Sequence, residues 1–293
     1  RAGHPGQGRE VGRVNAAPGG RVSSGSSFHY SFGLLPSGQR RGIESVYAFC
    51  RAIDDLADEG PVDRERSSAG LREYRREIAL CYAGEEPTLG VTRNLKAAVL
   101  RFGIPRQPLE DLLDGVEMDL TKSRYSSFDE LRLYCSRVAS AVGLICLPIF
   151  GCRDPRSRDY AIDLGIALQL TNILRDLKAD AARGRIYLPL DEIAAAGYSQ
   201  AELLQGARTP AFLALMQHQA ERAHRYFRSA ARGLPEPDRP RLLTAEVMRA
   251  IYLRLLRRIE RHGFRVFDRR FSVPRLTQLG LALRAWVLGD VRD

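Results

Sequence analysis

Two groups of acidic side chains in this sequence recur at helical spacing. In the stretch 54–59, Asp54 and Asp58 are four residues apart, so a helix places both carboxylates on one face about one turn apart. Like charges at this spacing repel, and acidic residues at a helix C-terminus oppose the helix dipole. The pair therefore needs a cation, and Mg²⁺ suits carboxylate and phosphate oxygens. Taken alone, the motif is equally compatible with a solvated acidic helix end.

A second polar row follows further along the chain. Asn172, Asp176 and Asp180 are spaced i, i+4, i+8, and Gln169 falls on the same helical face. The residues around the row are apolar: Leu164, Ile166, Leu168, Leu170, Ile173 and Leu174. This pattern predicts a helix that is buried on most sides and turns its polar row toward a cavity. Surface ion pairs are the alternative, but the row contains no alternating basic residues.

Carboxylate rows on two helices of one bundle predict a cage for divalent ions and a diphosphate group. A unit-charge interaction at about 4 Å is worth roughly 4 kcal/mol at an effective dielectric of 20. Several metal–oxygen contacts would therefore assist the ionisation of an allylic diphosphate. Arg51, Arg175 and Arg185 lie beside the rows and are suited to binding phosphate oxygens. Because the chain is rich in arginine throughout, an ordinary surface residue remains a strong alternative for any one of them.

Helical periodicity extends over almost the whole sequence after residue 26. Predicted helices cover 37–60, 63–83, 91–102, 108–122, 128–149, 156–182, 209–232, 239–262 and 274–288. The segment 127–130, Ser-Phe-Asp-Glu, has the form of a capping box and predicts a helix start there. No stretch alternates like a strand. We expect an all-α fold of about ten helices in one domain over 26–290, a helical bundle with a central cavity, preceded by a disordered leader over 1–25.

Composition narrows the function classes. The 293 residues carry a formal net charge of +10, compatible with nucleic acid, anionic lipid or polyanionic small substrates. We expect no nucleic-acid partner, because the aspartate rows oppose one and no zinc-finger or RNP-type motif is present. The five cysteines form no CxxC pair and predict buried thiols in a reducing compartment. The longest apolar run, 142–150, is shorter than the roughly 20 residues of a spanning helix. We therefore expect a cytoplasmic protein.

The chain resembles the squalene/phytoene synthase family, the head-to-head condensing prenyl synthases. The matching stretches are SSFHYSFGLLP (26–36), YAFCRAIDDLADE (47–59), LRLYCSRVASAVG (131–143), GIALQLTNILRDLKADAARGRIYLP (165–189) and AIYLRLLRRIERHGFRVF (250–267). They follow the family's order and cover most of the chain after residue 26. QLTNILRD followed by GRIYLP is the most specific part, and it implies the fold of the isoprenoid synthases.

The resemblance assigns expected roles residue by residue. It implies that two or three Mg²⁺ ions and the diphosphates are held by Asp54, Asp58, Asn172, Asp176 and Asp180. It implies phosphate contacts at Arg51, Arg175 and Arg185, and further substrate contacts at Gln169 and Tyr187. Tyr134 matches a tyrosine near the developing carbocation, Phe28 and Tyr47 match the donor site, and Val138 and Val142 match the wall of the prenyl tunnel. The family usually has Glu at the position of Ala179. Because Asp176 and Asp180 are retained, metal binding is expected to survive, with either a loss of ligand orientation or a changed metal affinity.

The implied reaction condenses two farnesyl diphosphates into presqualene diphosphate. The residues of the first two stretches most resemble those of bacterial presqualene diphosphate synthases of hopanoid biosynthesis. NADPH is required only if the reaction continues to squalene, and the sequence has no Gly-rich fingerprint of a Rossmann-type site. The alternatives are a phytoene synthase that uses two geranylgeranyl diphosphates and, less favoured, a non-catalytic scaffold relative.

Peripheral contact with the inner membrane face is a further expectation. A set of arginines at helical spacing would face anionic lipid there: Arg254, Arg257, Arg258, Arg261 and Arg265. A solvated arginine face is the alternative.

Overall fold

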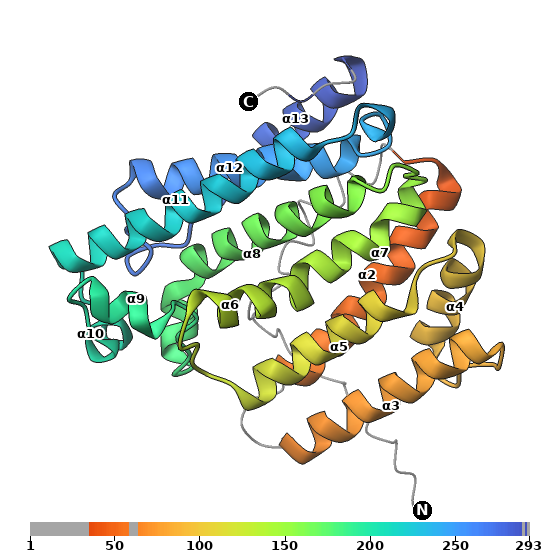
Figure 1. Cartoon of the computed structure of the whole chain (residues 1–293), viewed down its shortest axis with the longest axis horizontal. Coiled ribbons are helices and arrows are strands. Elements are labelled where there is room, and N and C mark those ends of the chain that lie inside the picture. Colours follow the sequence, from red (N-terminus) through yellow and green to blue (C-terminus); the bar gives the residue numbers. More distant parts are fainter. Residues whose placement is uncertain (1–34, 59–63, 289–290, 292–293) are drawn as a thin grey trace, which may run out of the picture.

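The computed structural model describes residues 35–58, 64–288 and 291, which form a bundle of α-helices (Figure 1). The helices of the first half are α2 (Ser37–Asp58), α3 (Arg64–Ala83), α4 (Gly90–Phe102), α5 (Arg106–Thr121), α6 (Phe128–Cys135) and α7 (Ala141–Phe150). Those of the second half are α8 (Ser157–Ala182), α9 (Leu190–Ala195), α10 (Gln200–Gln205), α11 (Pro210–Gly233), α12 (Leu243–Arg261) and α13 (Arg275–Leu288). The all-α fold class is confirmed.

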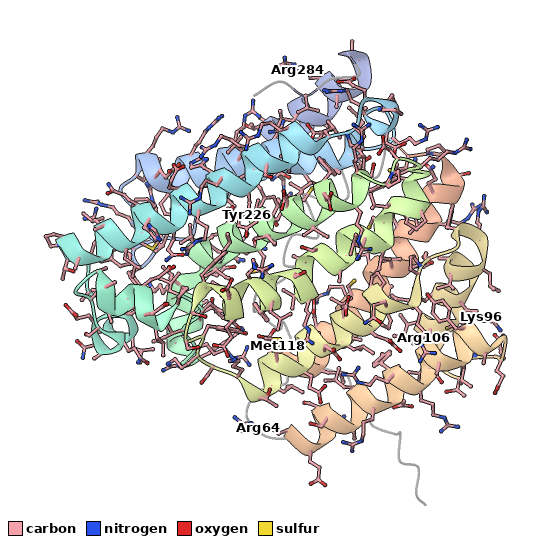
Figure 2. All side chains as sticks on the ribbon, in the orientation of Figure 1. Arg64, Lys96, Arg106, Met118, Tyr226 and Arg284 are labelled. Atoms are coloured by element: carbon pink, nitrogen blue, oxygen red, sulfur yellow. The ribbon has the colours of Figure 1, made fainter. Side chains whose placement is uncertain are left out.

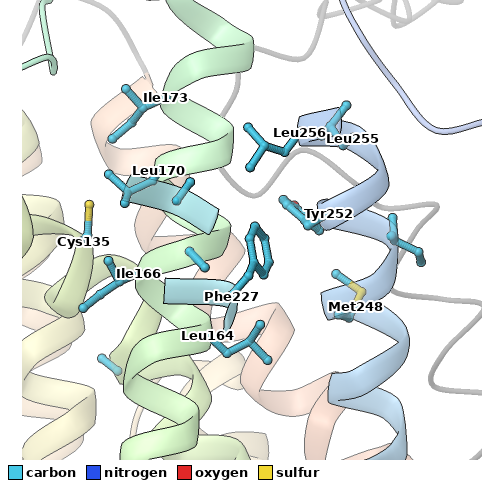
Figure 3. Close-up of a cluster of buried hydrophobic side chains, with 14 of the residues drawn as sticks. Cys135, Leu164, Ile166, Leu170, Ile173, Phe227, Met248, Tyr252, Leu255 and Leu256 are labelled. Carbon is cyan, nitrogen blue, oxygen red and sulfur yellow. The ribbon is translucent and has the colours of Figure 1, made fainter. Parts of the chain in front are cut away.

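Helix α8 lies in the middle of the bundle. Figure 1 shows α11 and α12 on one side of α8, and α6, α7, α2 and α5 on the other. Figure 3 shows part of the core, where Phe227 of α11 lies between α8 and α12, with Tyr252 and Met248 on the facing side of α12. On the opposite side of α8, Ile166 is directed toward Cys135 of α6. A helix packed on several sides must be apolar around most of its circumference, so any polar row on it borders an internal space.

A single long helix built from α6, a π-helical turn and α7 runs beside α8. The π-helical turn spans Ser136–Ser140 and was not expected from the sequence, which predicts one regular helix over 128–149. Two glycines allow it to pack closely. A Cβ atom on Gly165 of α8 would lie 2.5 Å from the Cα atom of Ser140, and one on Gly115 of α5 would lie 2.7 Å from Val138 Cγ1. Ser140 Oγ also donates to the carbonyl of Ile162 on α8 at 2.8 Å.

This composite helix, Phe128–Phe150, is long and apolar enough to cross a membrane by length and composition. The longest uninterrupted apolar run is short because Ser136, Arg137 and Ser140 break it, but these three residues do not lower the average hydropathy of the helix below that of a membrane-spanning one. The helix packs against α5 and α8. Its apolar composition therefore fits its place in the bundle core.

Besides the π-helical turn, the sequence analysis missed three features and mispredicted one. Helices α9 and α10 are six residues each, and an isolated parallel bridge joins Arg124 to Ile186. Helix α6 begins after Ser127 as predicted, but the capping box does not form: the Glu130 carboxylate instead accepts from the backbone and hydroxyl of Ser126. Lys122 also pairs with Glu130, which gives that carboxylate partners outside the box.

All five cysteines are free thiols, but the prediction that they are buried holds for only three of them. Cys50, Cys81 and Cys135 are buried, whereas Cys146 and Cys152 are partly exposed. The division into a leader over 1–25 and a domain over 26–290 stays a prediction, since residues 1–34 lie outside the described part of the chain.

Candidate active site

A polar cavity of about 380 Å³ lies beside the C-terminal half of α8. The predicted row faces this space: Gln169, Asn172, Asp176 and Asp180 all line it. Its remaining lining includes four basic residues, namely Arg175, Lys178, Arg183 and Arg270, together with Tyr187. Carboxylates and basic groups in one cavity are the complement expected for an anion bound together with cations.

An apolar cavity of about 160 Å³ continues from the polar one. Gln169 and Asn172 belong to the lining of both cavities, so the two spaces meet at these amides. Tyr47, Val138 and Val142 line the apolar cavity, where the resemblance placed a donor-site residue and the tunnel wall. The combination of a charged chamber and an apolar tunnel matches a ligand with a polyanionic head and a hydrocarbon tail.

The direction of the apolar cavity follows from the pairing of α7 with α8. Ser140 contacts Gly165, and Gly143 lies against Ala161, so the two helices are antiparallel. The lining along α8 runs from Asn172 back to Tyr160, which is about 18 Å at the α-helical rise. Phe150 at the C-terminus of α7 lines the same far end. The cavity therefore begins at the two amides and ends among aromatic side chains.

Asp176 is held by a buried arginine. Arg175 Nε donates to Asp176 Oδ1 at 2.9 Å and a second contact joins Arg175 Nη2 to Oδ2, while Arg270 Nε lies 4.0 Å from Oδ1. Burial alone would lower the pKa of Arg175, but its hydrogen bonds and charge pairing with Asp176 raise that pKa above its ordinary value. Arg175 is thus a permanent cation beside Asp176 at the wall of the polar cavity.

The polar row fits Mg²⁺ with a diphosphate. Asn172 Oδ1 is buried and accepts no hydrogen bond from the described residues, although its Nδ2 donates to Gln169 Oε1 at 3.4 Å. A buried acceptor of this kind costs stability unless a ligand uses it. Within the described part, no three His, Cys, Asp or Glu side chains cluster tightly enough to hold a metal ion by themselves. Mg²⁺ does not require such a cluster, since substrate phosphates and water supply the remaining ligands.

Other predicted site residues lie outside the lining of both cavities. Arg51 Nη2 pairs with Asp55 on the outer part of α2 at 3.3 Å, and Asp54 is half-buried one turn after the cavity-lining Cys50. Burial, with the charge of Asp54, raises the pKa of the Cys50 thiol. Arg185 Nη2 donates to the main-chain carbonyl of Asp119 at 3.1 Å. Phe28 and the side chain of Asp58 lie outside the described residues.

Tyr134 and Tyr187 meet at a carboxylate that the sequence analysis did not single out. Asp119 at the end of α5 accepts from Tyr134 at Oδ2 and from Tyr187 at Oδ1, each at 3.0 Å. The rings of Tyr134 and Tyr187 stack with centroids 5.3 Å apart, and Tyr125 stacks on Tyr187 at 5.6 Å. Of this cluster, Tyr187 lines the polar cavity. Arg183 and Arg270 were also missed, since an arginine-rich chain offers no contrast by which to select them, and Lys178 was missed because it falls off the i, i+4 spacing of the polar row.

Comparison with known proteins agrees with this geometry. The family model described as squalene/phytoene synthase matches residues 22–277. A phytoene synthase of Arthrospira platensis is 37% identical over 89% of this chain and 90% of its own length. A 15-cis-phytoene synthase of Synechococcus elongatus shows the same identity over the same shares of the two chains.

Solved structures give the same result. Squalene synthase HpnC from Alicyclobacillus acidocaldarius is 30% identical with a TM-score of 0.74, covering 81% of this chain and 89% of its own. A dehydrosqualene synthase solved with a ligand is 27% identical, also with a TM-score of 0.74, covering 91% and 93%. Together with the paired cavities, these matches establish that the chain belongs to the squalene/phytoene synthase family.

Proposed function

We propose that this protein joins two molecules of farnesyl diphosphate head to head and releases presqualene diphosphate. The observation that carries the proposal is the continuity of a charged chamber with an apolar tunnel at Gln169 and Asn172. A prenyl diphosphate has the matching division into a charged head and an apolar chain. Family membership supports the reaction class, because family members are prenyltransferases.

The chain's own residues would bind and orient the diphosphate. Asp176, Asp180 and Asn172 are the described residues suited to hold Mg²⁺, which when bound supplies charge neutralisation for the leaving diphosphate. Arg175, Lys178 and the other basic residues of the chamber would hold the phosphate oxygens. The apolar lining around Val138 and Val142 would exclude water from the carbocation that ionisation leaves behind.

The C15 substrate is proposed on two grounds. The apolar cavity has a volume of about 160 Å³ and ends among Phe150 and Tyr160, and such a small space favours the shorter chain. The amino-acid sequences of the stretches 26–36 and 47–59 also resemble those of presqualene-forming enzymes. Condensation of two geranylgeranyl diphosphates to phytoene is the second candidate, and the curated relatives at 37% identity favour it, since they carry the name phytoene synthase.

Product analysis by mass spectrometry separates these candidates. The purified protein is incubated with Mg²⁺ and farnesyl diphosphate, with and without NADPH, and in parallel with geranylgeranyl diphosphate. Presqualene diphosphate in both farnesyl reactions is the expected result. Squalene formed only with NADPH would extend the reaction to reduction, and phytoene from the C20 substrate alone would replace the proposal with the second candidate. Absence of product from folded protein would favour a non-catalytic scaffold.

A further inference from the structure

A buried carboxylate bridges two of the tyrosines next to the polar cavity. Asp119 is 6% exposed, and each of its two oxygens accepts one phenol hydroxyl at 3.0 Å. Its main-chain carbonyl accepts from Arg185 Nη2, so three segments are fastened together at the end of α5: α6, the loop over 183–189 and α5 itself. Tyr134 is fully buried, and Tyr187 is 3% exposed and lines the polar cavity.

The chemistry of this bridge fixes the direction of both hydroxyl groups. An ionised carboxylate only accepts hydrogen bonds, so Tyr134 and Tyr187 must both act as donors toward Asp119. Each phenol oxygen then keeps its lone pairs for other contacts. A hydroxyl that donates to an ionised acceptor gains electron density on its own oxygen, because the negative charge of the carboxylate polarises the O–H bond. The orientation of the hydroxyls and the higher electron density on their oxygens both make the tyrosines better at stabilising a nearby positive charge.

Aromatic packing restrains the same residues. The rings of Tyr134 and Tyr187 stack at an interplanar angle of 28°, and Tyr125 stacks on Tyr187 at 25°. The backbone next to Tyr187 is fixed by the bridge between Arg124 and Ile186, with Ile186 N donating to the Ser123 carbonyl at 3.0 Å. The cluster is therefore held by ring contacts, backbone pairing and the carboxylate together.

We propose that Asp119 is a positioning residue for the reaction. It holds the hydroxyl of Tyr187 at the wall of the polar cavity and that of the buried Tyr134, whose ring stacks on Tyr187, so that both oxygens are electron-rich acceptors next to the space where ionisation creates positive charge. The inference rests on the proposed function, because the charge to be stabilised is that of a prenyl cation. Asp119 itself acts through the two tyrosines and is not a catalytic residue.

A double-mutant cycle tests this role. Asp119→Asn keeps the shape of the side chain but replaces one acceptor oxygen with a donor, so at most one tyrosine keeps its bond. The expected result is a fall in kcat of about 30-fold to 100-fold with KM changed less than about threefold, since orientation and not binding is lost. Combining Asp119→Asn with Tyr187→Phe is expected to lower kcat little beyond the larger single effect, because both changes remove the same interaction.

Asp111→Asn is the matched control for these variants. Asp111 lies on the same helix as Asp119, and its Oδ1 accepts a hydrogen bond from Gln107 at 2.9 Å instead of from the tyrosines. Its activity is expected to stay at the wild-type level. A loss in Asp111→Asn as large as that in Asp119→Asn would assign the effect to α5 in general and overturn the inference.

Two further results would also overturn it. One is a wild-type kcat in Asp119→Asn, and the other is a double variant whose loss equals the product of the two single losses. Unfolding by urea of the wild type, the two single variants and the double variant gives a readout that needs no turnover. If the wild type forms no product from any prenyl diphosphate, the proposed function fails. The unfolding cycle still decides whether Asp119 holds the hydroxyls. If the stability lost in the double variant equals the sum of the losses in the two single variants, Asp119 does not hold them.

Discussion

At the scale of single residues, the side-chain oxygen of Asn172 lowers the stability of the fold but is placed to bind a ligand. Its Oδ1 atom is buried with no hydrogen-bond partner among the described residues, at the point where the two cavities meet. A buried acceptor left in this state costs about 1–3 kcal/mol. Retaining it makes physical sense only if the occupied site uses the oxygen, as a metal ligand does.

Asn172→Leu is therefore expected to separate stability from activity. The substitution removes the unpaired acceptor at similar volume, so the melting temperature should stay the same or rise, while product formation should fall at least about 100-fold. Thermal unfolding and mass-spectrometric product assays on the same preparation measure both. Asn94→Leu, on the exposed face of α4, is the matched control and should leave activity unchanged. Equal losses of stability and activity in Asn172→Leu would mean that Asn172 is only structural.

Phe150 offers a second residue-scale test, of chain length. Its side chain lines the far end of the apolar tunnel, so Phe150→Ala should lengthen the tunnel. We expect the ratio of kcat/KM for the C20 substrate to that for the C15 substrate to rise about tenfold, in the range that a few carbon contacts in an apolar pocket supply. A ratio is measured within one preparation, which cancels any loss of folded enzyme. An unchanged ratio would show that Phe150 does not limit the chain.

At the scale of elements, glycine decides how closely helices approach. A Cβ atom on Gly165 would lie 2.5 Å from Ser140 Cα and 2.6 Å from Ser140 N, and both of these are backbone atoms that a rotamer change cannot move. The π-helical turn and α8 would have to separate. Because both elements line the apolar tunnel, separating them would alter the tunnel as well as the packing.

Gly165→Ala is expected to destabilise the fold by about 1–3 kcal/mol or more and to lower activity. Denaturant unfolding monitored by circular dichroism gives the free-energy change. Gly280→Ala is the control: Gly280 also lies within a helix, α13, but its Cβ would meet nothing within 4 Å. There the higher helix propensity of alanine should stabilise the protein by up to about 1 kcal/mol. If both variants behaved alike, close packing at Gly165 would not be the cause.

Glu77 joins two elements by serving as a cap. Its buried carboxylate on α3 accepts from Thr88 N and Leu89 N at 3.0 Å and from the hydroxyls of Thr88 and Thr92, next to the start of α4. Burial alone would raise the pKa of Glu77, but these hydrogen bonds lower it from 4.5 to about 2. A carboxyl with a depressed pKa in the folded state stabilises the fold at neutral pH.

The resulting pH dependence has a definite sign. The contribution of Glu77 is fully present above its unfolded pKa of 4.5 and is lost as the pH falls toward 2. A pKa difference of this size between the unfolded and folded states corresponds to about 3 kcal/mol of stability. Glu77→Gln should therefore lower stability at pH 7 and flatten the loss of stability between pH 5 and about 2. Acid unfolding followed by circular dichroism measures the profile. Glu73→Gln, exposed on the same helix, is the control; a Glu77→Gln profile as steep as that of the wild type would contradict this account.

At the scale of the whole molecule, α13 carries an apolar stripe on its outer face. Leu276, Leu279, Leu283 and Val287 are 83%, 48%, 57% and 64% exposed and recur at helical spacing. Arg275 and Arg284 flank the stripe, and Figure 2 shows Arg284 on the outside of the bundle. The arginines expected from the sequence to face lipid are on or next to the neighbouring α12, where Arg254, Arg257 and Arg261 border a shallow basic depression together with Glu260.

We expect the apolar stripe of α13 to bind anionic lipid, since an apolar stripe flanked by arginines suits an interfacial helix. The double variant Leu276→Ser/Leu283→Ser should lose most co-sedimentation with anionic phospholipid vesicles. The variant Leu100→Ser, which changes an equally exposed leucine on α4, should not. Binding should also weaken as salt rises. Equal sedimentation of wild type and double variant would assign any lipid binding to another surface.

The sequence by itself determined the helices and the polar row, because both depend on local periodicity. The spacing of Asn172, Asp176 and Asp180 places them on one face whatever surrounds the helix, and the structure turns that face to a cavity. The helix boundaries agree to within a few residues for the same reason. The short helices α9 and α10 were missed because six residues carry too little periodic signal.

Only the tertiary structure decided which distant residues share a site. Asp119 lies 15 positions from Tyr134 and 68 from Tyr187, so no spacing rule predicts their contact. The three residues meet because α5 packs against α6 and against the loop over 183–189. The π-helical turn likewise requires two glycines on other helices, Gly115 and Gly165, to leave space for it. Local sequence sets the face that each helix presents, whereas contacts between helices select the neighbour that the face meets, because those contacts depend on packing across the whole bundle.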